Sequence, residues 1–302
     1  MPQLIRSKTI LNKTKRRDPW FLDDYTLNPY SGCSFNCLYC YIRGSKYGEN
    51  MEEGIVVKTN SLEILEKQLS ARAKKSQYGF VAVGSAIDAY MHHEEKWKLT
   101  EGTLKLLLKY RFPVFISTKC ALILRDVDLL KEIDKTAILP GDLRQNLNRG
   151  VILCVSISTM NNHITNILEP GALPPQQRLH VLQELKGHGF LVGVNAIPTL
   201  PLISDTEEEL ENTIVSAKQA SADYILVGGL TLFGSQPADS KTLYFQFLKK
   251  YDSSLIPKYE KMYGSNFFPP KYYLEKLGKK AMNLCAKHQV RASILNEYVP
   301  GT

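Results

Sequence analysis

Three cysteines lie close together in the segment NPYSGCSFNCLYCY, which spans residues 28–41. Cys33, Cys37 and Cys40 have the spacing C-x3-C-x2-C, and Gly32 gives the loop the backbone freedom to fold back and bring three thiolates together. Cysteine thiolates hold iron–sulfur clusters, normally four for a four-iron cluster, so three would leave one iron open to a small ligand. Tetrahedral zinc would need a fourth ligand, and the next histidine is the distant His92. An iron–sulfur cluster is therefore favoured, with zinc as the alternative.

The composition is that of a globular protein. The chain has 302 residues, of which 44% are hydrophobic and 23% charged, and this excludes wholesale disorder. The other cysteines, Cys120, Cys154 and Cys285, are scattered, which excludes a disulfide-rich secreted scaffold. No apolar run approaches the roughly 18 residues that span a bilayer, and the N-terminus lacks the apolar stretch of a secretory signal. We expect a cytoplasmic protein without membrane contact.

The net charge of +8 is concentrated at the two ends of the chain. Residues 1–17 carry six lysines and arginines and no acid, and residues 241–302 carry eleven against four acids. The stretch between them has more acidic than basic residues. Basic ends on a mildly acidic body suit a protein that binds a polyanion, although solvated lysines give the same balance. DNA or RNA is therefore an open partner.

Short β-branched runs alternate with helical stretches over the first 230 residues. The expected strands are Tyr25–Asn28, Phe80–Val83, Val114–Ile116, Val151–Ile157, Leu191–Ala196 and Tyr224–Val227. The expected helices are Leu62–Lys74, Leu99–Tyr110, Val127–Ile133, Gln176–His188 and Thr206–Ala220, the last with Asp205 as its N-cap. This alternation predicts a parallel sheet. We favour an α/β fold with an incomplete (βα)6 TIM-type barrel, because a full barrel of eight units would need about 250 residues.

Three parts of the chain are expected: a basic N-terminal arm at 1–20, the partial barrel at 21–235, and a C-terminal helical extension at 236–302. In an α/β barrel the loops after the strands share the active face, and the cysteine segment follows the first strand. The extension interleaves many aromatic residues with ten lysines between 241 and 287. Such residues suit stacking on a nucleic acid strand, but their helical spacing favours core packing with the lysines pointing outward.

The cysteine spacing, with the aromatic Tyr39 before the last cysteine, resembles the signature of the radical S-adenosylmethionine (SAM) superfamily. The resemblance implies a [4Fe-4S] cluster on Cys33, Cys37 and Cys40, with SAM bound through its amine and carboxylate to the open iron. It implies reductive cleavage of SAM to a 5'-deoxyadenosyl radical that abstracts hydrogen from a substrate. It also implies a ferredoxin- or flavodoxin-like electron donor as a partner and places Tyr39 against the adenine.

Further segments are similar, in order, to the branch of that superfamily related to spore photoproduct lyase. They are IVVKTNSLEILEKQL, VAVGSAIDAY, PVFISTKCALILRDVDLL, VSIST, LEPGALPPQQRLHVLQELKGHGFLVGVNAIPTLP and the tail rich in Tyr and Lys. The resemblance implies that Ser85, Lys119 and either Ser156 or Ser158 bind SAM. The two serines alternate with apolar neighbours, so we expect both to face inward. Asp88 and Tyr90 are candidate contacts to SAM or substrate, with loop anchoring as an equal alternative.

One departure from that branch concerns the hydrogen donor. The lyase has a cysteine near the end of the second strand, where this chain has VGSA at 83–86. Cys120 and Tyr90 are the candidates to relay hydrogen instead. Glu169 and Arg178 are expected to form a charge-assisted pair that fixes the loop between them, and Cys154 is expected in the core.

These observations predict a radical SAM enzyme that acts on a nucleic acid or nucleotide. A peptide or small metabolite remains an alternative substrate, and a radical SAM methyltransferase an alternative enzyme. A non-catalytic iron–sulfur or zinc protein that binds nucleic acid is the alternative from another class.

Overall fold

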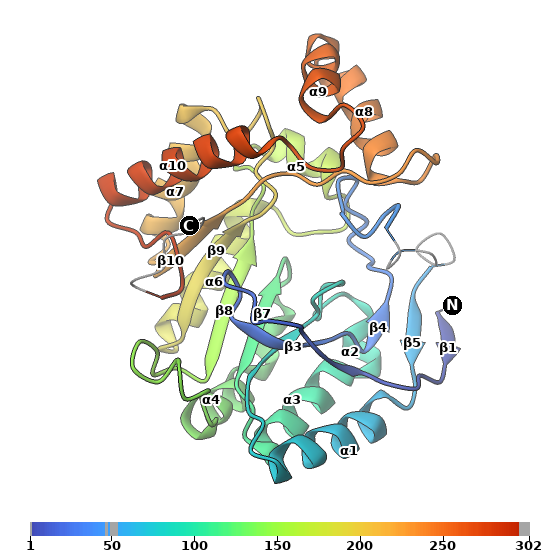
Figure 1. Cartoon of the computed structure of the whole chain (residues 1–302), viewed down its shortest axis with the longest axis vertical. Helices are drawn as coiled ribbons and strands as arrows, with labels where there is room; N and C mark the ends of the chain where they lie inside the picture. The colour runs from blue at the N-terminus through green and yellow to red at the C-terminus, as the bar shows by residue number, and fades with distance from the viewer. Residues whose placement is uncertain (1, 46–47, 49–53, 296–302) are drawn as a thin grey trace.

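The computed structural model describes residues 2–45, 48 and 54–295. Its main sheet has seven strands in the order β10-β9-β8-β7-β6-β3-β2 (Figure 1). The parallel strands are β3 (Asp23–Leu27), β6 (Phe80–Val83), β7 (Val114–Thr118), β8 (Val151–Ser156), β9 (Leu191–Ala196) and β10 (Tyr224–Val227). The strand β2 (Leu11–Lys13) pairs antiparallel with β3. The six expected strands are confirmed to within two residues at each end.

Helices make most of the connections between these strands. They are α1 (Ser61–Lys74), α2 (His93–Trp97), α3 (Leu99–Tyr110), α4 (Val127–Thr136), α5 (Asn162–Leu168), α6 (Pro175–Gly187) and α7 (Glu207–Gln219), with a 3-10 turn η1 at Ala121–Asp126. The expected N-cap of α7 is wrong by one residue, because the hydroxyl of Thr206 accepts the backbone N–H of Glu209 at 3.2 Å. Asp205 instead accepts hydrogen bonds from the backbone N–H of Leu202 and the hydroxyl of Tyr273.

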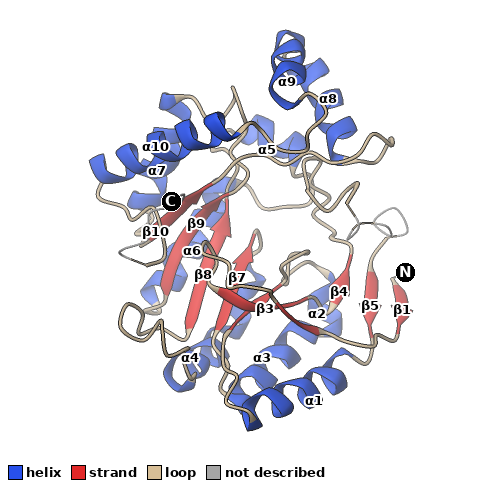
Figure 2. Cartoon of the chain, viewed as in Figure 1, coloured by secondary structure: helices blue, strands red, loops and turns tan. Residues whose placement is uncertain are grey.

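The central strands are covered on both sides, which explains their nearly continuous apolar sequences. Every residue of β6, β8 and β10 is buried. Residues such as Val81 and Leu153 pack with the helices, whereas Phe80, Phe115 and Cys154 pack in a separate cluster, as alternation along a strand requires. Figure 2 shows the helices arranged around the outside of the strands. This α/β fold with a mainly parallel sheet is consistent with the expected partial barrel.

The N-terminal residues, expected to form a basic arm, contribute two strands. The strand β1 (Gln3–Ile5) joins β5 (Val56–Lys58) and β4 (Tyr30–Ser31) in a second sheet of three strands, and β2 extends the main sheet. Strands of two or three residues are too short to show a period of two, so the sequence pattern does not indicate them.

The C-terminal part holds α8 (Ser240–Tyr251), the 3-10 turn η2 (Ser253–Leu255), α9 (Ile256–Tyr263) and α10 (Lys271–Lys287). The helix α10 packs beside α7 and β10 (Figure 1). Core packing is confirmed for four aromatic residues of α8 and α9, namely Tyr244, Phe247, Tyr259 and Tyr263. Phe267, Phe268 and Tyr272 are instead exposed. Within the described ranges, no helix combines the length and apolar character needed to cross a membrane.

Candidate functional site

A cavity of about 570 Å³ lies against the cysteine loop and the ends of the central strands. Each of β6, β7, β8 and β9, or the loop directly after it, contributes to its wall. Eight of the predicted site residues line it, namely Cys33, Cys37, Cys40, Tyr39, Ser85, Asp88, Lys119 and Ser156. Three others, Tyr90, Cys120 and Ser158, do not. The structure therefore brings most of the predicted site into one cavity.

The cysteine loop folds back on itself as its spacing requires. Gly32 has φ +75°, and a Cβ atom there would approach the carbonyl oxygen of Gly54 to 2.7 Å, so no other residue fits without strain. Two turns follow, in which the backbone N–H groups of Asn36 and Cys40 donate to the carbonyl oxygens of Cys33 and Cys37 at 3.3 and 3.2 Å. These turns hold all three thiols at the cavity wall.

The donor set of this loop fits an iron–sulfur cluster. In the described part of the chain, no three His, Cys, Asp or Glu side chains lie close enough to share one metal ion. A cluster binds each thiolate through a different iron, so its ligands lie farther apart. Burial raises the pKa of all three thiols, that of Cys33 to about 11, so their thiolates depend on a bound metal. Cys33, Cys37 and Cys40 are the residues that would hold the cluster.

Arg43, three residues after the last cysteine, braces the loop. Its Nε donates to the carbonyl oxygen of Cys37 at 3.1 Å, and one Nη donates to that of Ala238 at 3.2 Å. The other Nη donates to the side chain of Asn36. The guanidinium thus ties the cysteine loop to the segment before α8. Sequence reasoning missed Arg43 because two of its partners are backbone carbonyls, which leave no residue-type signal.

We expect Arg43→Met to weaken iron retention in the reconstituted protein by about 10- to 100-fold, the usual effect of losing a group that orients metal ligands. Release of iron to a chromogenic chelator under anaerobic conditions measures it. Arg144→Met is the matched control, because among the described residues the guanidinium of Arg144 donates a hydrogen bond only to the carbonyl oxygen of Leu139. Equal iron release from the two variants would contradict the bracing role.

Asp88 joins the loops after β6 and β7. Its carboxylate accepts hydrogen bonds from the backbone N–H groups of Tyr90 at 2.9 Å and Lys119 at 2.7 Å, and from the hydroxyl of Thr118 at 2.7 Å. These bonds support the anchoring role for Asp88, although its side chain also lines the cavity. They place Lys119 at the end of β7 with its side chain at the cavity wall.

Lys119 presents a charged ammonium to the cavity. Burial acts to lower the pKa of Lys119, but the charges of Cys37 and Glu169 outweigh it and the pKa is raised. Within the described ranges no hydrogen bond or ion pair occupies this ammonium, so it is available to an anionic or hydroxyl group in the cavity.

The two serines of the fourth parallel strand differ in position. The Oγ of Ser156 lies 2.8 Å from the Oγ of Ser117, and both line the cavity. Ser158 lies beyond the end of β8 and donates its hydroxyl to Oε1 of Glu169 at 2.7 Å. The expectation that both serines share the inward face is therefore corrected, because strand alternation stops at Ser156.

Glu169 is the centre of a buried polar network. It forms an ion pair with Arg178, and the two residues are only 2% and 1% exposed. The hydroxyl of Tyr39 also donates to Glu169, and Arg178 donates to the carbonyl oxygen of Ser156 at 2.8 Å. The expected pair is confirmed, and the structure adds its link to the cavity through Tyr39.

The two candidates for a hydrogen relay lie away from the cavity wall. Tyr90 is fully buried in the main core, where burial and the charge of Asp126 raise its pKa. Tyr90 belongs to the core cluster and is not among the residues that line the cavity, and its role as a hydrogen relay stays a prediction. Cys120 is half-buried just after β7 and packs against core residues. Its role as a hydrogen donor stays a prediction.

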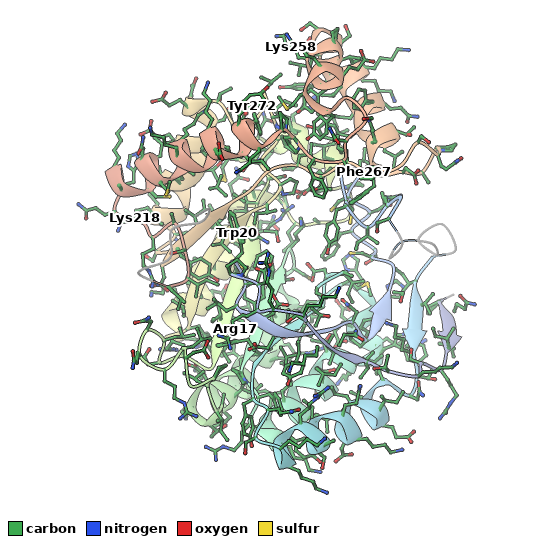
Figure 3. The ribbon with its side chains drawn as sticks, viewed as in Figure 1. Arg17, Trp20, Lys218, Lys258, Phe267 and Tyr272 are labelled. Carbon is green, nitrogen blue, oxygen red and sulfur yellow. The ribbon has the colours of Figure 1, made fainter. Side chains whose placement is uncertain are left out.

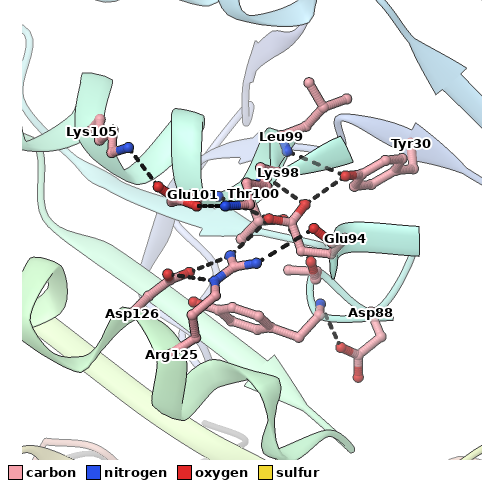
Figure 4. Close-up of polar contacts among 12 residues, drawn as sticks. Tyr30, Asp88, Glu94, Lys98, Leu99, Thr100, Glu101, Lys105, Arg125 and Asp126 are labelled. Atoms are coloured by element: carbon pink, nitrogen blue, oxygen red, sulfur yellow. Dashed lines mark hydrogen bonds and ion pairs between the residues drawn. The ribbon is translucent and has the colours of Figure 1, made fainter. Parts of the chain in front are cut away.

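A second buried network fixes the start of the cysteine loop (Figure 4). The fully buried Glu94 accepts the hydroxyl of Tyr30 at 2.5 Å and pairs with Arg125 at 2.9 Å. Arg125 also pairs with Asp126 at 2.8 Å. Glu94 further accepts the backbone N–H of Thr100 at 2.9 Å, at the first turn of α3. Because Tyr30 stands two residues before Gly32, this network anchors the loop from behind.

Sequence reasoning missed Asp23, the first residue of β3. It lines the cavity and is only 5% exposed, and within the described chain no other residue donates a hydrogen bond or a positive charge to its carboxylate. Burial raises the pKa of Asp23 to about 6, with the charges of Asp18 and Asp24 acting in the same direction. The neighbouring Asp24 is instead paired with Arg17. Two adjacent aspartates thus have opposite environments.

We expect Asp23→Asn to stabilise the protein at pH 8 by on the order of 2 kcal/mol, because the charged carboxylate opposes folding. The folded-state pKa of about 6 lies above the usual value of 3.8, so the gain is complete above pH 6 and vanishes below about pH 4, where both states are protonated. Urea unfolding of the variant and the unmodified protein at pH 8 and pH 4 measures this difference in stability. A variant less stable at pH 8 would contradict the interpretation.

Comparison with known proteins identifies the family. The model of the radical SAM superfamily matches residues 27–216, which is more than half of the chain. An uncharacterised protein of Mycobacterium bovis is 27% identical over 272 residues, covering 88% of this chain and 75% of that protein. A protein of Pseudomonas phage M6, named a radical SAM Nα-GlyT isomerase, is 22% identical over 213 residues, covering 70% of this chain and 40% of that protein.

Solved structures of spore photoproduct lyase share the fold. One mutant of that enzyme, with bound AdoMet and dinucleoside spore photoproduct, superimposes with a TM-score of 0.64 at 14% identity. The superposition covers 94% of this chain and 78% of the lyase. The family match spans the cysteine loop and four of the six parallel strands, β6 to β9, and leads to one conclusion: the chain belongs to the radical SAM superfamily.

Proposed function

We propose that this protein is a radical SAM enzyme that acts on a nucleic acid or nucleotide, with Cys33, Cys37 and Cys40 holding a [4Fe-4S] cluster. The observation that carries the proposal is the shared cavity, which these cysteines line together with Ser85, Lys119 and Ser156. When bound, the cluster supplies the electron that splits SAM into methionine and a 5'-deoxyadenosyl radical. A ferredoxin- or flavodoxin-like protein is the proposed electron donor.

The residues around the cavity suit the binding of SAM. The ammonium of Lys119 matches a carboxylate or ribose hydroxyl, and the hydroxyl of Ser156 matches a ribose hydroxyl. The ring of Tyr39 is 5% exposed at the cavity wall, and its hydroxyl bond to Glu169 fixes the ring plane available to an adenine. Apolar side chains, among them Phe35, complete the wall and limit water near a reactive intermediate.

Three observations support a nucleic acid or nucleotide as the substrate class. The phage relative is named a radical SAM Nα-GlyT isomerase, and the lyase structure contains a dinucleoside spore photoproduct. The exposed Arg16 lines the cavity, and no ion pair of its guanidinium lies within the described ranges. An unpaired guanidinium at the mouth of a cavity suits a phosphate group.

The proposal is tested by anaerobic reconstitution with iron and sulfide, followed by dithionite and SAM, with products identified by mass spectrometry. Formation of 5'-deoxyadenosine supports a radical SAM enzyme. S-Adenosylhomocysteine as a further product would indicate a methyltransferase. A bound cluster without any SAM cleavage would favour the non-catalytic iron–sulfur protein and contradict the proposal.

Binding of a single-stranded oligonucleotide is expected to weaken as the salt concentration rises, because phosphate contacts release counterions. Arg16→Ala is expected to reduce the slope of log K against log salt by about 1, the loss of one phosphate contact. Fluorescence anisotropy at several salt concentrations measures both. Lys67→Ala in α1 serves as the control, and a slope of zero for the unmodified chain would contradict phosphate contact.

A further inference from the structure

The cavity extends along β3 and has chemically different ends. The cysteine loop follows the carboxyl end of this strand, whereas Asp23 is its first residue, and both line the cavity. Leu27 lies four residues after Asp23 along the strand, a span of about 13 Å at roughly 3.3 Å per residue. Thiols and the ammonium of Lys119 therefore lie at one end, and the carboxylates of Asp23 and its neighbour Asp18 lie at the other.

The walls near Asp23 are aromatic. The ring of Phe21 lies 5.1 Å from the ring of Phe115 in β7, and both rings line the cavity. Figure 3 labels Trp20 and Arg17, which belong to the N-terminal segment that brings Phe21 and Asp23 to the sheet. Leu22, which lies between Phe21 and Asp23, has φ +58°, and its backbone N–H donates to the carbonyl oxygen of Asp18 at 2.9 Å. This turn precedes β3 and determines the direction in which the side chains after it point.

Arg17 and Asp18, which line the cavity together with Asp23, have other partners. Arg17 donates from Nε to Asp24 at 3.1 Å and pairs with Asp142. Asp18 accepts the backbone N–H groups of Trp20 and Phe21 at 2.8 and 3.0 Å. None of these groups neutralises Asp23, which is left as a buried carboxylate open to the cavity. Such a group is costly to fold unless a ligand supplies its partner.

The carboxylate and the aromatic rings at the Asp23 end of the cavity favour a cationic ligand. A carboxylate forms its strongest hydrogen bonds with ionised N–H donors, and aromatic rings attract an ammonium through their faces. An anionic group would be repelled by Asp23. We propose that Asp23 binds a protonated amine carried by the molecule that occupies this end of the cavity, with Phe21 and Phe115 flanking it.

The amine belongs to the substrate, because the opposite end holds the residues that match SAM. The assignment of the amine to the substrate rests on the proposed function. The binding of an amine by Asp23 is independent of that function, because amine binding is measured without reductant and without turnover.

The test compares two small probes of equal shape, benzylamine and benzyl alcohol, on the full reconstituted chain under anaerobic conditions at pH 7.5. Ligand-observed NMR titration gives their dissociation constants. We expect benzylamine to bind at least about tenfold more tightly, the usual effect of a hydrogen bond to a charged group. In Asp23→Asn this preference is expected to disappear while benzyl alcohol still binds. Asp128→Asn, which removes an exposed carboxylate of α4, is expected to keep the preference.

Equal binding of the two probes to the unmodified chain would overturn the inference. A preference for the amine that persists in Asp23→Asn would overturn it as well. Circular dichroism checks that the variant is folded, and Asp23→Ser is used if the asparagine variant is not. Cleavage of SAM by a protein without amine preference would contradict this inference alone, whereas amine preference without SAM cleavage would contradict only the proposed function.

Discussion

Alanine in place of Cys37 is expected to abolish both cluster binding and the cleavage of SAM. Each thiolate of the loop would hold a different iron, so two remaining cysteines cannot retain a four-iron cluster. The thiol of Cys37 lies at the cavity wall, and the carbonyl oxygen of the same residue accepts a hydrogen bond from Arg43, so the backbone at this ligand is held in place. The same result is expected for Cys33→Ala and Cys40→Ala.

Iron content, the visible absorbance of the reconstituted protein and the yield of 5'-deoxyadenosine measure this effect. Cys285→Ala is the matched control, because that cysteine is buried in α10 among apolar residues. We expect the control to keep its iron and Cys37→Ala to give no more 5'-deoxyadenosine than a mixture without protein. Full activity of Cys37→Ala would refute the assignment of the cluster.

Glu169→Gln is expected to reduce the free energy of unfolding by about 3–5 kcal/mol, the usual cost of leaving one member of a buried ion pair without its partner. Arg178 is 1% exposed and cannot reach water when the carboxylate is removed. Tyr39 and Ser158 lose a charged acceptor in the same step. We therefore expect weaker binding of SAM as well, because the ring of Tyr39 is no longer fixed.

Urea unfolding followed by circular dichroism measures the loss of stability. The double variant Glu169→Gln with Arg178→Met is expected to recover part of it, because no unpaired charge then remains buried. Glu63→Gln, which removes an exposed pair with Lys67 on α1, is expected to leave the stability unchanged. If the double variant loses more unfolding free energy than the two single variants lose together, this explanation is contradicted.

The order of strands and helices was predictable because both faces of the sheet are covered. Continuous apolar runs such as Phe80–Val83 and Tyr224–Val227 form strands at the predicted residues. Helices such as α3 also begin and end as predicted, since an amphipathic period of 3.6 is a local property. The short strands β1 and β2 were missed, because they depend on pairing with distant segments.

The predicted site was partly recovered for a similar reason. The cysteines lie within eight residues, so one loop brings them together, and Ser85, Lys119 and Ser156 lie at or just after strand ends that parallel pairing brings to one cavity. Tyr90 and Ser158 show where this reasoning fails. Each lies near a strand end, but the side chain of Tyr90 packs into the core and that of Ser158 bonds to Glu169.

The sequence by itself determined the chemistry this protein can support, since three closely spaced thiols and the alternation of strands and helices are local patterns. Only the tertiary structure decided which charged groups are paired. Asp24 meets Arg17 while the adjacent Asp23 faces a cavity, and Glu94 is buried against Arg125 although it follows two histidines in a polar stretch. Pairing and burial depend on residues far apart in the chain, so no local pattern of residue types reveals them.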